Sequence, residues 1–330
     1  MACGAAVDAF SGANRSPGAA LVKFLQYRDA LRSLPAASEK PIDKTLRAVN
    51  IAAHQNGRRN ALFSLPDLFS VVGRTALVTG GATGLGRVCA EALLSAGARV
   101  LIASRKAEAC EAVAKELSAL GPCEGFGGTV ASEPGVTALA EEVRKRTDKL
   151  DILVNNAGVS WGGRFETFEW KGWEKVLSLN VMGLFTLTRD LMPLLLKSGG
   201  EDRPATIVNI GSVMGTSTQS ENAYSYSASK AAVHHLTRIL AAEFAGRHVT
   251  VNAIAPGPFK TGMTSFTLDK QEGLAAALAA VPMRRIGRAE DIAATLLYLA
   301  GRGGAYTTGA IIPVDGGVSV HAPPVMLPEV

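Results

Sequence analysis

The sequence predicts an α/β fold in which helices cover both faces of a parallel, doubly wound sheet. From Arg74 onward, short β-rich apolar runs alternate with longer helix-like segments, a pattern typical of strand–helix–strand units. Glycine-rich or polar stretches directly follow several of these runs. Because open α/β sheets bind ligands beyond the carboxyl ends of their strands, we expect a binding site at that edge.

The expected strands and helices follow one another from residue 75 to residue 314. Short continuous apolar runs are typical of buried parallel strands, whereas the longer segments have the length of helices. The expected strands are residues 75–79, 99–103, 152–155, 206–210, 250–254 and 310–314. The expected helices are residues 86–96, 107–120, 134–147, 168–197, 226–245 and 289–300.

Composition and charge argue against several classes of protein. Hydrophobic residues make up 47% and charged residues 19% of the 330 residues, which suits a filled core rather than bulk disorder. Of the net charge of +5, residues 1–70 carry +4 and the remainder only +1, so nucleic-acid binding is not expected. No uninterrupted apolar run reaches the length of about 18 residues that a membrane span needs, and no membrane contact is expected.

The cysteines favour a reducing compartment. Cys3, Cys89, Cys110 and Cys123 form no CxxC pair and show no metal-like spacing with the five histidines. So few thiols in so long a chain do not make a disulfide framework. We therefore expect no metal site and a cytoplasmic location, with the mitochondrion as the alternative.

Residues 1–65 differ in composition from the rest and are expected to form an N-terminal extension. They mix small residues with two helix-like pieces, at 21–34 and from Pro41 through Ile51. Four acids in the first 43 residues count against a transit peptide, which is poor in acids. The sequence thus predicts an extension over 1–65, a catalytic domain over 66–321 and a C-terminal tail over 322–330.

A glycine-rich turn joins the first expected strand to the first expected helix. Residues 79–86 are Thr-Gly-Gly-Ala-Thr-Gly-Leu-Gly. Glycines let the backbone approach a pyrophosphate at a helix N-terminus, where free N–H groups and the helix dipole favour negative charge. A glycine cluster between a strand and a helix therefore indicates a dinucleotide site.

The spacing TGxxxGxG resembles the short-chain dehydrogenase/reductase family, in particular its 3-oxoacyl-reductase-like members. Further landmarks of that family follow in order: Asn155 to Gly158, Ser212, the pair Tyr226 and Lys230, Pro256-Gly257, and Asp315 to Gly317. The resemblance spans about residues 66–320 and implies a Rossmann fold. It implies a cofactor site formed by Thr79, Gly80, Thr83, Gly84, Leu85, Gly86, Asn156, Ala157, Gly158, Tyr226, Lys230, Pro256, Gly257 and Thr261.

The residues after the second strand bear on the choice of cofactor. Ser104, Arg105 and Lys106 stand there without an acid. A carboxylate would hold the ribose hydroxyls and repel a 2′-phosphate, whereas a guanidinium would pair with that phosphate; in this family the pattern implies NADP(H). The alternative is that Arg105 only starts a solvated helix. Thr129 and Val130 stand where the family often has Asp before a hydrophobic residue, and the Thr129 hydroxyl can still reach the adenine edge.

Tyr226 and Lys230 are the expected centre of the chemistry. They lie four residues apart at the start of an expected helix and hence on one face. A free tyrosine has a pKa near about 10, and a nearby cation lowers it, so we expect Tyr226 to exchange a proton with a substrate oxygen. The resemblance implies that Lys230 also holds the nicotinamide ribose. An ordinary surface helix contact is the alternative explanation for such a pair in isolation.

Ser212 and Asn180 complete the expected set. Ser212 follows an expected strand through Gly211, and its hydroxyl can stabilise a substrate oxyanion; its spacing to Tyr226 is one residue longer than is common in the family. The resemblance implies that Asn180 holds a water that connects Lys230 to solvent. His234, His235 and His248 are expected to serve in packing or to face solvent.

The apolar segment 258–285 has the position of the family's substrate lid. The resemblance implies an NADPH-dependent reductase of a small-molecule ketone or alcohol, with a 3-oxoacyl or related ketone as substrate. A sugar-acid (gluconate-type) or polyol dehydrogenase is one alternative, and a non-catalytic NADP(H)-binding scaffold is another. Family members usually form homodimers or homotetramers through the helices that correspond to 168–197 and 226–245.

Overall fold

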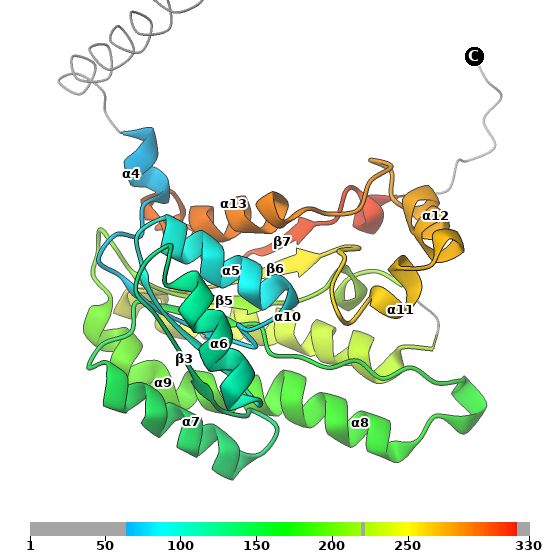
Figure 1. The fold of residues 1–330 in the computed structure, drawn as a ribbon, viewed down its shortest axis with the longest axis horizontal. Coiled ribbons are helices and arrows are strands. Elements are labelled where there is room, and N and C mark those ends of the chain that lie inside the picture. Colours follow the sequence, from blue (N-terminus) through cyan, green and yellow to red (C-terminus); the bar gives the residue numbers. More distant parts are fainter. Residues whose placement is uncertain (1–63, 219–221, 322–330) are drawn as a thin grey trace, which may run out of the picture. The chain divides into compact units, whose positions relative to one another are not determined.

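The described residues form a three-layer α/β/α domain with a central parallel sheet (Figure 1). The computed structural model describes residues 64–218 and 222–321, and within them seven strands pair in the order β3-β2-β1-β4-β5-β6-β7. The predicted parallel, doubly wound sheet is confirmed. The strands are β1 (Thr75–Thr79), β2 (Arg99–Ser104), β3 (Cys123–Gly127), β4 (Ile152–Asn155), β5 (Ala205–Ile210), β6 (Val249–Pro256) and β7 (Ile311–Val314).

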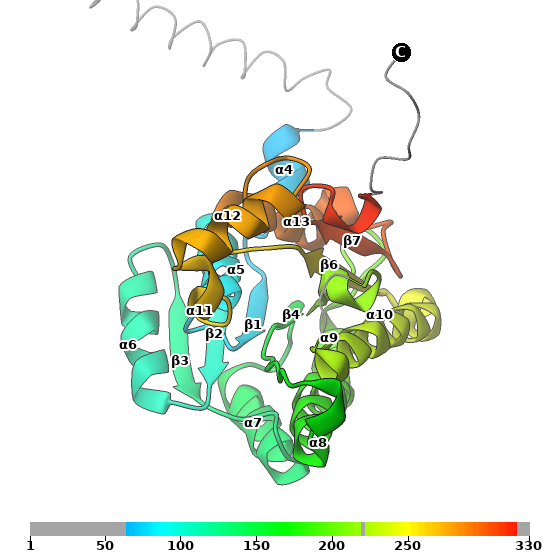
Figure 2. The ribbon, with the colours of Figure 1, turned by 90° about the vertical axis from the view of Figure 1, so that its right-hand side faces the viewer.

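Helices cover both faces of the sheet (Figure 2). One face carries α5 (Gly84–Ser95), α6 (Ala107–Leu117) and α13 (Ala289–Ala300). The other carries α7 (Glu133–Arg146), α9 (Leu184–Ser198) and α10 (Tyr224–Phe244). Successive strand residues point to opposite faces, so Val78 and Ile102 belong to the first core and Leu77 and Leu101 to the second.

The structure departs from the expected elements at one strand, three short helices and one long helix. Strand β3 was not expected, because its sequence CEGFG has two glycines and little apolar character. A Cβ on Gly125 would collide with the Cys110 carbonyl oxygen, so the close packing of α6 explains the glycine. The short helices α4 (Leu65–Phe69), α11 (Ser265–Leu268) and α12 (Gln271–Ala280) were not expected either.

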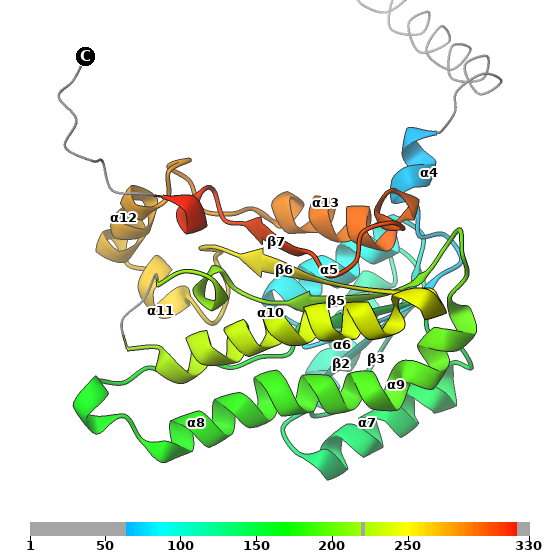
Figure 3. The same ribbon diagram turned by 180° about the vertical axis from the view of Figure 1, so that it is seen from behind.

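The expected helix 168–197 is divided into three parts. Helix α8 (Trp170–Leu177) leads into a π-helical turn, Ser178–Gly183, which continues as α9. Trp170–Ser198 is long and apolar enough to cross a membrane, but 56% of its most apolar window is buried inside the domain. Figure 3 shows it side by side with α10. That burial is typical of a core helix and gives no support to a membrane span.

The strand order reverses between β1 and β4. Strand β1 pairs with β2 on one side and with β4 on the other, and the chain leaves these two strands toward opposite faces of the sheet. Such a switch point opens a crevice beyond the carboxyl ends of the strands. Figure 2 looks onto this edge, where α11 and α12 also lie.

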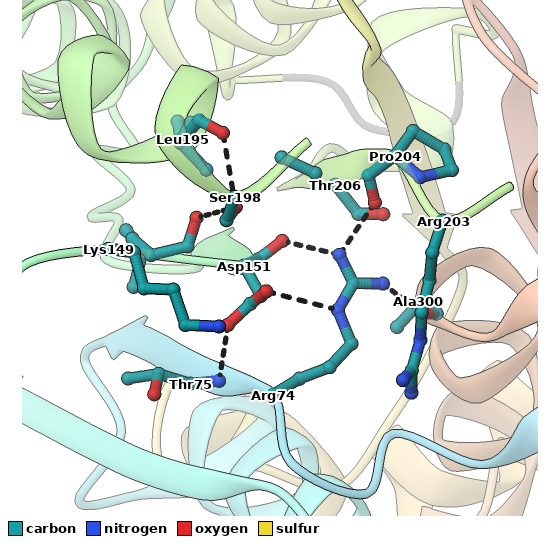
Figure 4. A network of polar contacts seen from close by, with 12 residues as sticks. Arg74, Thr75, Lys149, Asp151, Leu195, Ser198, Arg203, Pro204, Thr206 and Ala300 are labelled. Carbon is teal, nitrogen blue, oxygen red and sulfur yellow. Dashed lines mark hydrogen bonds and ion pairs between the residues drawn. The ribbon is translucent and has the colours of Figure 1, made fainter. Parts of the chain in front are cut away.

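The amino-terminal edge of the sheet is held by Arg74 (Figure 4). Its guanidinium is 4% exposed and donates to the carbonyl oxygens of Ala300 (2.8 Å), Asp151 (2.9 Å) and Pro204 (2.6 Å). The Asp151 carboxylate lies 3.9 Å from Arg74 Nε and accepts a bond from the Thr75 N–H at 2.8 Å. Burial lowers the pKa of Arg74 to about 10, so the side chain stays charged at neutral pH.

The expected division into extension, domain and tail stays a prediction. Most of the extension, with its two helix-like pieces, and all of the tail lie outside the described residues.

Replacing Arg74 by Met should strongly destabilise the domain. The change removes the Arg74 donor from the buried carbonyl groups of Ala300, Asp151 and Pro204 and removes the cation beside the Asp151 carboxylate. Breaking a buried ion pair from one side costs about 3–5 kcal/mol. The free energy of unfolding is measured by urea titration with circular dichroism. The matched control is Arg203→Met, because within the described part of the chain that exposed guanidinium makes only two bonds, both of 3.3 Å, and its loss should cost less than about 1 kcal/mol. Equal losses in the two variants would contradict the role of Arg74.

Candidate active site

A cavity of about 400 Å³ lies at the carboxyl edge of the sheet, over the switch point. Most residues predicted for the site line it: Thr79, Gly80, Thr83, Gly84, Leu85, Ser104, Arg105, Thr129, Val130, Asn156, Ala157, Gly158, Ser212, Tyr226, Lys230, Pro256, Gly257 and Thr261. Gly86, Lys106 and Asn180 are not among the lining residues. The fold thus brings together in one cavity residues from Thr79 to Thr264, which are 185 residues apart in the chain.

The glycine-rich turn has the shape that a pyrophosphate site requires. Gly80 and Gly84 have φ values of +66° and +53°, a region that favours glycine. A Cβ on Gly86 would collide with the Gly80 carbonyl oxygen and with Asn156 Nδ2, so Gly86 shapes the site from behind. Thr83, the N-cap of α5, makes no side-chain capping bond. The N–H groups of the first helical turn therefore remain for an anion at the cavity.

Thr79 and Asn156 join the loops that follow β1 and β4. The Thr79 hydroxyl oxygen accepts bonds from the N–H groups of Asn156 (3.0 Å) and Ala157 (3.1 Å). Asn156 Nδ2 in turn donates to the Thr79 carbonyl oxygen at 2.9 Å. These reciprocal bonds fix the two loops to each other across the switch point.

Arg105 and Ser104 line the cavity beyond the end of β2. Arg105 is exposed and forms no ion pair with any described residue, so its guanidinium is available to a phosphate. Lys106 is also exposed but serves as the N-cap residue of α6, outside the lining. Of the two predicted cations, Arg105 is therefore the better placed.

Lys230 lies below Tyr226, as the four-residue spacing predicts. Its Nζ is 5.5 Å from the centre of the Tyr226 ring and donates to the Ile210 carbonyl oxygen at 2.7 Å. Lys230 is 5% exposed, and burial lowers its pKa to about 8. The ammonium group is therefore still mostly charged at neutral pH.

The pKa of Tyr226 does not follow the expectation. Burial raises it above its ordinary value, and the hydrogen bond with Ser212 offsets this only in part. The expected lowering of the Tyr226 pKa was therefore wrong, because desolvation of the buried phenol is the largest influence on it. Tyr226 therefore holds its proton at neutral pH, the state that a proton donor needs.

Ser212 begins the turn that follows β5. It caps a short 3₁₀ helix, Val213–Gly215, in which its Oγ accepts a bond from the Met214 N–H at 3.2 Å. Because that bond uses a lone pair, the hydroxyl proton is left for Tyr226 or for a substrate oxygen.

Asn180 lies behind the cavity, in the π-helical turn. Its side chain is bonded to the Val159 N–H and carbonyl (both 2.9 Å) and to Ser229 Oγ (3.0 Å). A Cβ on Gly158 would lie 3.5 Å from Asn180 Oδ1 and 3.8 Å from Lys230 Nζ, so Gly158 separates the two side chains. π-Helical turns occur frequently at functional sites, and a Cβ on Gly183 would collide with the Val130 carbonyl oxygen.

Sequence reasoning missed much of the apolar wall of the cavity. Val159, Leu179, Phe259 and Met263 line it, but only the last two stood in the expected lid, and neither was assigned to the site. Phe259 is held in place because its ring occupies the space beside Gly287, with which it forms a β-bridge. His235 and His248 are exposed, as expected for solvent-facing residues, and His234 is buried.

Comparison with known proteins agrees with this geometry. The model of a family described as enoyl-(acyl carrier protein) reductase matches residues 80–319. A rhamnolipids biosynthesis 3-oxoacyl-[acyl-carrier-protein] reductase from Pseudomonas aeruginosa is 49% identical over 76% of this chain and 97% of its own length. A galactitol 2-dehydrogenase (L-tagatose-forming) from Cereibacter sphaeroides is 38% identical over 77% of this chain and 98% of its own length.

Solved structures show the same likeness. The NADP active-site complex of Pseudomonas aeruginosa RhlG matches with a TM-score of 0.75 and 48% identity, over 77% of this chain and 99% of that one. A gluconate 5-dehydrogenase from Burkholderia cenocepacia, in complex with NADP and tartrate, matches with a TM-score of 0.73 and 28% identity, over 78% and 100%. The chain therefore belongs to the short-chain dehydrogenase/reductase family and is an NADP(H)-dependent oxidoreductase that acts on CH–OH or C=O groups.

Proposed function

We propose that this chain reduces the ketone of a 3-oxoacyl thioester or a related apolar substrate, with NADPH as the reductant. The observation that carries the proposal is the meeting of Ser212, Tyr226 and Lys230 with the apolar wall at one cavity. The residues present suit NADPH: Gly80 and Gly84 form a cradle for the pyrophosphate, and Arg105 supplies an unpaired cation for the 2′-phosphate. When bound, NADPH supplies the hydride.

The residues of the chain supply the proton and the oxyanion site. The Ser212 hydroxyl is proposed to donate a hydrogen bond to the substrate carbonyl oxygen, which polarises the C=O bond. The protonated Tyr226 phenol then gives its proton to that oxygen as negative charge develops there. The Lys230 ammonium, fixed by Ile210, stabilises the phenolate that remains. The buried amide of Asn180 orients the Val159 loop above this group.

The lining of the cavity favours an apolar ketone over a sugar acid. Among the described lining residues the cationic side chains are Arg105 and Lys230. Arg105 stands at the end expected for the cofactor phosphate, and Lys230 lies beneath Tyr226. A sugar-acid carboxylate would need a further cation or donor cluster, whereas Val159, Phe259 and Met263 suit an aliphatic chain. The 3-oxoacyl name of the Pseudomonas relative supports the same choice.

Assembly and location stay predictions. Homodimers or homotetramers through the helical run from α8 to α9 and through α10 are supported by three apolar side chains on these elements, because Met182, Phe185 and Ile239 are 63%, 41% and 47% exposed. Light scattering of the purified protein measures the assembly. A cytoplasmic location is expected from the sequence, and fractionation of expressing cells tests it.

Removing the Tyr226 hydroxyl should abolish most turnover and leave cofactor binding intact. We expect Tyr226→Phe to lower kcat by about 10²–10⁴-fold, the range for loss of a general acid, because a phenylalanine ring has no acidic proton to give to the substrate oxygen. The kcat is measured with a 3-oxoacyl thioester, and the NADPH Kd by cofactor fluorescence.

The matched control is Tyr224→Phe. Tyr224 lies two residues earlier and packs edge-on against Phe165 and Phe168, with ring centres 5.8 and 5.3 Å apart, so the loss of its hydroxyl should leave kcat within about twofold. NADPH binding without turnover of any ketone or sugar acid by the wild-type protein would instead favour the non-catalytic scaffold.

Arg105 should determine the preference for NADPH. We expect Arg105→Ala to raise the NADPH Kd about tenfold, since a charge-assisted bond at an exposed site contributes about 1.5 kcal/mol. The NADH Kd should stay unchanged, because NADH carries no 2′-phosphate. Lys106→Ala is the matched control, and its effect on the NADPH Kd should be much smaller. Fluorescence titration measures all four values, and equal losses for the two cofactors would contradict the phosphate role.

A further inference from the structure

His234 lies directly behind the proposed catalytic groups. It follows Tyr226 by eight residues and Lys230 by four on α10, so the three side chains share one face of the helix. The imidazole is 3% exposed, and its Nε2 atom has no hydrogen-bond partner among the described residues. Buried polar atoms are normally bonded, so an exception beside a reaction site calls for a physical reason.

The imidazole ring fills the space on both sides of the Ser212 turn. A Cβ on Gly211 would collide with His234 Nε2 and lie 2.9 Å from Cδ2. A Cβ on Gly215 would lie 2.8 Å from Cε1 of the same ring. Gly211 directly precedes Ser212, and Gly215 is the last residue of the turn that Ser212 caps, so the ring is the spacer between this turn and α10. Its size sets where the Ser212 hydroxyl stands relative to Tyr226.

The charges around the ring are all positive. On α10 its electrostatic neighbours are Lys230 and Arg238. The turn 211–215, strand β5 and strand β6 carry no titratable side chain. Burial, with the two cations, lowers the pKa of His234 to about 4. The imidazole is therefore neutral at physiological pH, and Lys230 remains the buried cation below Tyr226.

We propose that His234 is a positioning residue that must stay uncharged: its neutral ring supports the Ser212 turn, and its protonation displaces that turn and reversibly switches off ketone reduction. An imidazolium in this place would face Lys230 and two glycine backbones without an acceptor. Moving toward solvent would relieve the repulsion and leave the space under Gly211 and Gly215 empty. The inference rests on the proposed function, because it gives Ser212 a part in that reaction.

The first test separates the space that the ring fills from the charge that it can carry. In His234→Ala the turn loses its support, so kcat at neutral pH should fall at least about tenfold, equivalent to about 1.4 kcal/mol of transition-state stabilisation. The NADPH Kd, measured by fluorescence, should change far less than kcat, because Gly80, Gly84 and Arg105, which are proposed to hold the cofactor phosphates, lie outside α10. His234→Gln keeps a neutral polar side chain of similar reach and should restore most of kcat. A normal kcat in His234→Ala would overturn the proposal.

The second test is the pH profile of kcat by stopped-flow mixing, with a return to neutral pH to establish reversibility. With a pKa of about 4, wild-type kcat should be halved at about pH 4 and fall about fourfold at about pH 3.5. This acid limb should vanish in His234→Gln. It should persist in the matched control His235→Gln, since His235 is the exposed neighbour on the same helix. An acid limb that survives in His234→Gln would overturn the charge argument.

A third measurement needs no variant and no turnover. Nuclear magnetic resonance of the imidazole nitrogens in the cofactor-free wild-type protein follows each histidine directly. His234 should stay neutral well below the ordinary histidine pKa of about 6.5 and should titrate together with a shift of the Ser212 and Met214 amide signals. Ordinary titration of His234, or titration without movement of these amides, would overturn the proposal. The catalytic role of Tyr226 would stand in either case, because Tyr226→Phe tests it separately.

Discussion

The buried guanidinium of Arg74 is the constraint from which the geometry of the opposite edge follows. It binds the chain where it enters β4 and β5 and where it leaves α13, while its own strand begins at the next residue. Strands that start level also end level when their lengths are similar. The loops after β1, β4 and β5 therefore emerge side by side, and these loops carry the glycine-rich turn, Asn156 to Gly158, and Ser212. The buried guanidinium of Arg74 at one edge of the sheet thus determines the spacing of the reactive groups at the opposite edge.

Most of the fold could be predicted because most of its strands and helices coincide with clear local patterns in the sequence. Continuous apolar runs gave strands such as residues 75–79 and 152–155, and helix α13 matches its expected bounds of 289–300. Strand β3 could not be predicted in this way, since it owes its place to pairing with β2 and to close packing of α6 on Gly125. Likewise, Gly183 in the π-helical turn packs closely against the Val130 carbonyl group, a contact that no local sequence pattern reveals.

For the site, the sequence predicted which residues carry the proposed chemistry better than it predicted the pKa values and the apolar surroundings of those residues. Tyr226, Lys230 and Ser212 stand at spacings that place them at strand ends and on one helix face, so their meeting could be foreseen. The pKa of Tyr226 could not, because it depends on how much water the folded cavity excludes. The apolar wall formed by Val159 and Phe259 also could not be predicted, because the sequence does not show which of the apolar residues in a loop will line the cavity. Specificity in this fold depends on such residues.

The π-helical turn at Ser178–Gly183 sets the rotation of α9 relative to α8 about the axis of the long helix. Each residue of an α-helix advances the chain by about 100° around its axis, so deleting one residue from this turn to restore a regular helix would rotate α9 against α8 by that angle. Leu187 and Leu191, now in the core, would swing toward solvent, and Asn180 would turn away from Val159. The irregular turn therefore fixes the angle about the helix axis at which the core-facing side of α9 stands relative to α8.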